Sequence, residues 1–112
     1  MNHEMKIKQP YFDKIQNGKK IYEIRLNDEK RKLINVGDSI TFKENDNLDN
    51  YFKAKVDDLI CFDSFTEMIS TLPPEKVGFE NLTNNQIVDI YHQFYSAEEE
   101  KKYGVLAIKI QI

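Results

Sequence analysis

The sequence carries little thiol and imidazole chemistry: one cysteine, Cys61, and two histidines, His3 and His92. A single cysteine cannot form a disulfide within the chain. The two histidines are far apart and no second cysteine accompanies them, which argues against a structural zinc site. Cys61 lies in the apolar run Leu59–Phe62, so we expect it to be a small, buried side chain of the core.

Long apolar runs are also missing. No stretch approaches the roughly 18 apolar residues of a membrane-spanning helix, and the first residues lack the apolar segment of a signal peptide. The chain contains neither a glycine-rich phosphate loop nor a Ser-His-Asp arrangement. These absences predict a cytoplasmic protein with no membrane partner, no metal and no cofactor.

The residues that are present suffice for one hydrophobic core. The chain has 112 residues, of which 40% are hydrophobic, including seven Phe and six Tyr, and 31% are charged. A chain of this length fits one domain and is too short for two ordinary ones. We therefore expect a single domain over residues 1–112.

Charge is unevenly distributed along the chain. Residues 1–43 hold ten Lys and Arg against six Asp and Glu, a net charge of +4, and residues 44–112 hold six against thirteen, a net charge of −7. An acidic chain with a basic first third is poorly suited to long nucleic acid, which requires many phosphate contacts, but it permits a local anion site. The alternative is that the two halves simply attract each other within the fold.

Alternating and β-branched segments predict about five strands. We expect them at residues 5–8, 20–26, 39–43, 51–62 and 103–112, with a polar loop over residues 44–50. In the second of these strands, Glu23 and Arg25 share one face, about 6.6 Å apart along the backbone. Strict alternation places Lys20 on the opposite face, unless the start of the strand bends or bulges.

Helices are predicted between these strands. Pro10 can open a first helix, which ends at Asn17-Gly18. Ser64 with Glu67, and Thr83 with Gln86, have the spacing of capping boxes and precede amphipathic segments, and residues 96–99 can cap one more turn. This order does not fit regular βαβ units. It favours an α+β domain, a small, mostly antiparallel β-barrel with inserted helices, in which closure removes exposed sheet edges.

Site-like chemistry is concentrated in Gly18–Arg25, with the sequence GKKIYEIR. Arg25 can fork onto a phosphate, a carboxylate or a base edge, and Glu23 can accept a hydrogen bond from an amine or pair with a cation. Tyr11 and several other aromatic residues could stack on a base, although core packing is the commoner role. The alternative for the segment itself is a solvated strand face with a surface ion pair.

This segment, followed by Val36-Gly37-Asp38-Ser39-Ile40, resembles the signature of the ASCH domain family. The helix opening at Gln9–Phe12 and the ending Lys102–Ile108 are similar too, so the resemblance covers almost the whole chain. The resemblance implies a PUA-like small barrel. It also implies a cleft, lined by the signature strand, that binds RNA, a nucleotide or a modified nucleoside, with Lys20, Glu23 and Arg25 as ligand-binding residues. Tyr11, as a ring that could stack on a base, completes the expected ligand-binding set.

One branch of small bacterial ASCH proteins deacetylates N4-acetylcytidine with a lysine, a threonine three residues later and a distant glutamate. Here the lysine matches Lys20 and the late glutamate matches Glu80, but Glu23 replaces the threonine. A threonine hydroxyl donates and accepts, whereas a carboxylate only accepts. A carboxylate beside Lys20 also favours the charged ammonium, which is the wrong form for a base or nucleophile. Glu23 could instead serve as the general base.

Three functional hypotheses follow. The first is a binding module for RNA, a nucleotide or a modified nucleoside. The second is an amidohydrolase acting on N4-acetylcytidine or a similar acylated amine, with Lys20 and Glu80 as catalytic residues. Use of Glu23 as the general base would make the catalytic site a different one from that of the family branch. The third is a protein-interaction module, which a shallow cleft blocked by a Glu23–Arg25 ion pair would favour.

Overall fold

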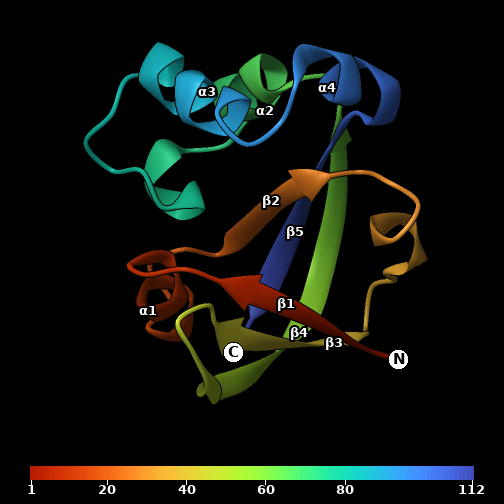
Figure 1. The fold of residues 1–112 in the computed structure, drawn as a ribbon, viewed down its shortest axis with the longest axis vertical. Coiled ribbons are helices and arrows are strands. Elements are labelled where there is room, and N and C mark those ends of the chain that lie inside the picture. Colours follow the sequence, from red (N-terminus) through yellow and green to blue (C-terminus); the bar gives the residue numbers. More distant parts are fainter.

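Five strands form one strongly curled sheet, a half-barrel, in the computed structural model, which describes residues 1–112 (Figure 1). Their bounds are β1 Asn2–Ile7, β2 Tyr22–Leu26, β3 Ser39–Glu44, β4 Asn47–Phe62 and β5 Val105–Gln111. The order across the sheet is β1-β3-β4-β5-β2, with β1 and β3 parallel and the other pairs antiparallel. The expected α+β, PUA-like small barrel with inserted helices is confirmed.

The curled sheet leaves β1 and β2 as its two edges, so it is a half-barrel rather than a closed barrel. No backbone ladder joins these edges. The Arg25 guanidinium on β2 reaches across instead and donates from Nη2 to the carbonyl oxygen of Lys6 on β1 at 3.2 Å. The opening between β1 and β2 is therefore spanned by a side chain, which leaves room for a cavity.

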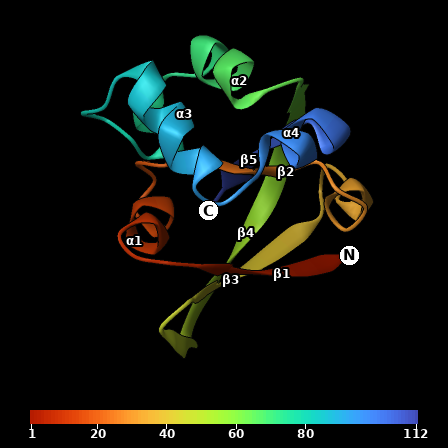
Figure 2. The ribbon, with the colours of Figure 1, turned by 45° about the horizontal axis from the view of Figure 1, so that its top comes forward.

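The helices gather mostly at one end of the half-barrel (Figures 1 and 2). Their bounds are α1 Tyr11–Gln16, α2 Phe65–Thr71, α3 Asn84–His92 and α4 Ala97–Tyr103, with short 3-10 turns η1 Arg31–Leu33 and η2 Pro74–Val77. The reciprocal capping box at Thr83 is confirmed, and Ser96 forms another with Glu99. Ser64 accepts only the one bond from the backbone N–H of Glu67. None of the helices combines the length and the apolar character needed to span a membrane.

Two apolar clusters fill the two sides of β5. Leu106, Ile108 and Ile110 point into the half-barrel, where they meet Phe12 and Phe42. Val105 and Ala107 point the other way, toward the helices, and join a second cluster. That second cluster contains Phe65, Met68, Val77, Phe79, Ile87 and Tyr91. A strand buried on both faces reads as a nearly continuous apolar run, which explains its sequence.

Several boundaries differ from the sequence expectation, among them the start of β1 at residue 2 rather than 5 and the start of β5 at residue 105 rather than 103. The polar stretch after β3 is not a loop of residues 44–50: the turn is only Asn45-Asp46, and β4 begins at Asn47. Its first residues are exposed, so the ladder with β3, rather than side-chain burial, holds them extended. β2 begins at Tyr22 instead of Lys20, a difference that shapes the candidate site.

Cys61 was expected in the core, and this expectation is wrong. Adjacent side chains of a strand point to opposite faces. Phe62 enters the core beside the helices, so Cys61 points away from it, and the cysteine is exposed. Its sulfur accepts a hydrogen bond from the side-chain amide of Asn27, at 3.7 Å. A short apolar run at a strand end therefore does not guarantee burial of each residue.

Native protein should react with one equivalent of Ellman's reagent without denaturant, because the one thiol is already exposed. The absorbance of the released thionitrobenzoate measures this reaction, and Cys61→Ser provides the blank. A thiol that reacts only after unfolding would show that Cys61 is buried.

Candidate functional site

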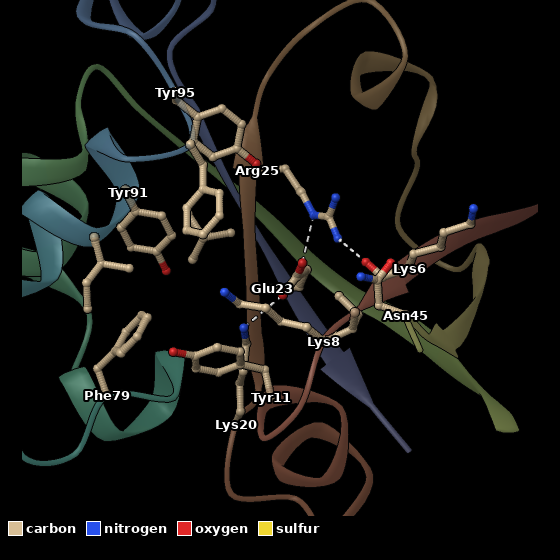
Figure 3. A pocket seen from close by; sticks show the side chains of 14 residues that line it. Lys6, Lys8, Tyr11, Lys20, Glu23, Arg25, Asn45, Phe79, Tyr91 and Tyr95 are labelled. Atoms are coloured by element: carbon tan, nitrogen blue, oxygen red, sulfur yellow. Dashed lines mark hydrogen bonds and ion pairs between the residues drawn. The ribbon is translucent and has the colours of Figure 1, made fainter. Parts of the chain in front are cut away.

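A cavity of 290 Å³ opens where the edges of the half-barrel approach each other (Figure 3). β1 and the residues after it form one side, β2 the floor, and α3 the opposite wall. Its lining combines cations, one carboxylate and aromatic rings: Lys6, Ile7, Lys8, Tyr11, Lys20, Glu23, Ile24, Arg25, Asn45, Phe79, Ile90, Tyr91, Phe94 and Tyr95.

Glu23 is the centre of the polar side of this cavity. Its Oε1 lies 2.8 Å from Lys20 Nζ, and its Oε2 accepts a hydrogen bond of 2.7 Å from Arg25 Nε. Glu23 and Lys20 are only 5% and 6% exposed. Arg25 also donates a hydrogen bond to the backbone carbonyl oxygen of Lys6. One chain of contacts therefore runs from Lys20 through Glu23 and Arg25 to β1.

Lys20 reaches this cluster because β2 has not yet begun at its position. The backbone N–H of Lys20 donates to Lys14 O, and that of Ile21 donates to Lys76 O, each at 2.9 Å. These bonds hold the chain in a bend between α1 and β2. The strict alternation that would have placed Lys20 on the other face therefore applies only from Tyr22 onward. The bend brings Lys20 and Glu23, three residues apart, to the same side.

The charges of the cluster reinforce one another. Burial by itself would raise the pKa of Glu23, but the nearby charges of Lys20 and Arg25 and their hydrogen bonds outweigh burial and lower it. For Arg25, burial would lower the pKa, yet the charge and hydrogen bond of Glu23 raise it. Both groups are therefore ionised at neutral pH, and the cavity contains a fixed carboxylate between two cations.

Aromatic rings form the apolar side. Phe79 makes edge contacts with Tyr11 and Tyr91, with centroid distances of 5.3 and 5.8 Å. The ammonium of Lys20 lies 5.2 Å from the centre of the Tyr11 ring, and that of Lys8 lies 4.7 Å from the centre of the Phe94 ring. Rings with nearby cations are the surfaces on which planar bases stack.

Gly78 lets Tyr11 and Lys20 pack close to the turn after η2. Its φ of +99° is a left-handed conformation, and a Cβ there would lie 3.1 Å from Lys20 Cδ and 3.3 Å from Tyr11 Cδ1. Any larger residue would be strained and would push on both side chains. Gly78 also accepts a hydrogen bond from Lys14 Nζ through its carbonyl oxygen, at 3.0 Å.

The structure brings Lys20, Glu23, Arg25 and Tyr11 into one cavity, but Glu80 is not part of its lining. The Glu80 carboxylate pairs with Lys14, at 3.1 Å from Oε1. Hydrogen bonds from its own backbone N–H and from Lys14, together with the charges of Lys14 and Lys19, lower its pKa and outweigh the opposing effect of desolvation. Glu80 is therefore an ionised surface group beside the site.

Sequence reasoning missed several lining residues. Lys6 and Lys8 fall within the strand expected over residues 5–8, and Asn45 falls within the expected polar loop, and neither pattern indicates a cavity. The apolar spacing of the segment after Thr83 places Ile87, Ile90, Tyr91 and Phe94 on one predicted buried face of the helix. Tyr91 does pack in the core, but Phe94 is exposed at the mouth of the cavity. Helical spacing gave the correct face for Tyr91 but could not show that its hydroxyl end meets a cavity. No group of three His, Cys, Asp or Glu side chains is arranged to hold a metal ion.

Comparison with known proteins decides the family. The family model described as ASCH domain matches residues 5–112. The chain belongs to the ASCH domain family. This family is generally linked to RNA binding, and the ASCH signature strand is the β2 strand that forms the floor of the cavity.

Two solved structures share the fold along nearly the full chain. A crystal structure of the hypothetical protein PH0355 is 40% identical, with a TM-score of 0.88, and the alignment covers 99% of this chain and 98% of that one. A solution NMR structure of protein PF0455 from Pyrococcus furiosus is 35% identical, with a TM-score of 0.80, covering 99% of this chain and 96% of that one. No curated protein gave a significant match.

Replacing the central carboxylate should destabilise the domain. Glu23→Gln leaves two buried cations without their counter-charge, and breaking a buried pair typically costs about 3–5 kcal/mol. Because the pKa of Glu23 is lowered in the fold, its stabilising contribution is complete above the ordinary value of 4.5 and is lost as the pH falls through the lowered one. Urea unfolding followed by circular dichroism should show this loss, with a smaller decline below pH 4.5 in the variant than in wild type.

Glu29→Gln is the matched control, because Glu29 is exposed and its pair with Lys32, at 3.5 Å, lies on the surface. An exposed pair contributes little, so this variant should unfold as wild type does. Equal stability of Glu23→Gln and Glu29→Gln would contradict a central role for the cluster.

Proposed function

We propose that this ASCH domain binds RNA, a nucleotide or a modified nucleoside in the cavity between β1 and β2. The observation that carries the proposal is the combination of stacking surfaces with an excess of cations in one open cavity. Lys6, Lys8, Lys20 and Arg25 line the cavity together with Glu23, its only carboxylate. The site is therefore positive although the chain as a whole is acidic, which fits a local phosphate-bearing ligand.

The size of the cavity favours one nucleotide unit at a time. At 290 Å³ it lies near the lower limit of ligand pockets, about 300 Å³. Phe79, Tyr91 and Phe94 offer apolar surface to a planar ring, and the exposed ammonium group of Lys8, beside the Phe94 ring, lies where an attached phosphate could leave the cavity. An RNA would then be held by one inserted base and its adjacent phosphates rather than along a long groove.

Loss of the cations that line the cavity should weaken RNA binding. A short, mixed-sequence, fluorescein-labelled single-stranded RNA is titrated with protein, and anisotropy is recorded at several salt concentrations. Arg25→Ala should reduce affinity at least about tenfold, because it removes a cavity cation. Since that change also disturbs Glu23, Lys8→Ala provides a second variant at an exposed position, and it should weaken binding across sequences and lower the salt slope by about one.

Lys53→Ala is the matched control, because Lys53 is equally exposed but lies on β4, outside the cavity. It removes the same charge and should leave binding almost unchanged. Equal effects of Lys8→Ala and Lys53→Ala would point to non-specific attraction, and unchanged affinity of Arg25→Ala would remove the proposed site.

The amidohydrolase alternative requires Lys20 and a proton-shuttling carboxylate on one substrate. Glu80 is paired with Lys14 outside the cavity, and Glu23 is bound by two cations, so neither is placed as a free base. We expect no cytidine when the protein is incubated with N4-acetylcytidine and the products are separated by chromatography. Turnover by wild type that is lost in Lys20→Ala would establish hydrolysis instead.

The protein-interaction alternative depended on a cleft blocked by the ion pair. The Glu23–Arg25 pair is present, but it forms one wall of the cavity and leaves its interior open. This arrangement supports a small ligand or a single nucleotide over a flat protein contact.

A further inference from the structure

Tyr91 places a hydroxyl group at the inner end of the cavity. The residue is only 8% exposed, and its hydroxyl makes no hydrogen bond to any other group of the protein. Figure 3 shows this hydroxyl pointing into the space that Lys20 and Glu23 also face. The hydroxyl is therefore open to the cavity rather than sealed in the core, and it can bond there to water or to a ligand.

The ring of Tyr91 does not need its hydroxyl for packing. It stacks on Phe65 with a centroid distance of 4.7 Å and an interplanar angle of 2°, and it meets the edge of Phe79. A phenylalanine ring could make both contacts. The hydroxyl therefore adds nothing to the core that the structure shows, and its orientation suits a group that enters the cavity.

Lys20 supplies a second donor at the same end. One of its three ammonium protons is directed to Glu23 Oε1, and the ring face of Tyr11 lies nearby. At least one proton therefore remains for a ligand. Burial, chiefly, raises the pKa of Tyr91 well above its ordinary value, so its hydroxyl is protonated at neutral pH and can donate as well.

Two donors directed at one place favour an acceptor with two lone pairs. A carbonyl oxygen has two, whereas a pyridine-type ring nitrogen has one. Beside these donors, Glu23 is an acceptor: each of its carboxylate oxygens is used by one cation and can still accept one more hydrogen bond. The inner end of the cavity is thus complementary to a carbonyl next to an N–H.

We propose that Tyr91 and Lys20 together bind a carbonyl oxygen of the ligand, while Glu23 accepts from the adjacent N–H. This inference rests on the proposed function and names its ligand class: a base with an –NH–C(=O)– edge, as in uracil or guanine, in preference to the amino edge of cytosine or adenine. Tyr91 is then a specificity-determining residue of the site.

The matched pair of ligands is uridine and cytidine 5′-monophosphate, which differ only in this edge. In isothermal titration calorimetry, wild type should bind the uridine nucleotide about tenfold more tightly, the equivalent of about one hydrogen bond. Tyr91→Phe should lose most of that preference by weakening the uridine nucleotide alone, with no decrease in melting temperature. Tyr51→Phe is the control, since Tyr51 is 60% exposed and outside the cavity.

The same –NH–C(=O)– group occurs in an N-acylated amine, so N4-acetylcytidine against cytidine forms a second pair. A preference that Tyr91→Phe reduces more in the uridine–cytidine pair assigns the –NH–C(=O)– group to the base itself. A preference that it reduces more in the acetylcytidine–cytidine pair assigns the group to an acylated amine. Equal binding within both pairs, or an unchanged preference in Tyr91→Phe, overturns the inference while leaving nucleotide binding in place. Absence of binding by all four ligands and by RNA overturns the proposed function as well.

Discussion

The carboxylate of Glu23 between Lys20 and Arg25 is the interaction on which the rest of the site depends. A buried ion pair is not in itself a source of stability, because the loss of hydration can exceed the attraction, and apolar residues of similar volume often serve as well. The cluster does something that apolar residues could not do. It fixes three charged groups with two short contacts, 2.8 and 2.7 Å, and so presents an oriented polar surface inside an apolar cavity.

The same cluster solves a problem of the fold. A five-stranded sheet that curls without closing leaves the backbone groups of β1 and β2 unpaired, and edges of this kind invite association with other chains. Arg25 joins the two edges through Lys6 O, and α3 covers the gap from above. The incomplete closure is therefore what creates the cavity, and the side chain that compensates for it is also one of the cavity's cations.

Local patterns in the sequence predicted much of this arrangement because they have local causes. The capping box at Thr83 and the nearly continuous apolar run of β5 depend on neighbouring residues. Lys20 could not be placed from alternation, because its position follows from bonds to Lys14 and Lys76, the latter 55 positions after Ile21. Cys61 was wrongly expected in the core, and the pairing of Glu80 with Lys14 could not be predicted, for a similar reason. The surroundings of both residues are set by tertiary contacts that periodicity does not encode.

The pairing of Glu23 with two cations explains why a glutamate at position 23 suits binding better than proton transfer. A carboxylate held by two cations cannot easily change its protonation state, since the pair that orders it also keeps it ionised. Such a group makes a poor proton shuttle but a dependable acceptor of fixed direction. The paired charges therefore lie on and next to β2, which forms the floor, and an exposed lysine, Lys8, lies at the rim. The proposed recognition of a base edge at the inner end and of phosphate at the outer rim rests on that single asymmetry.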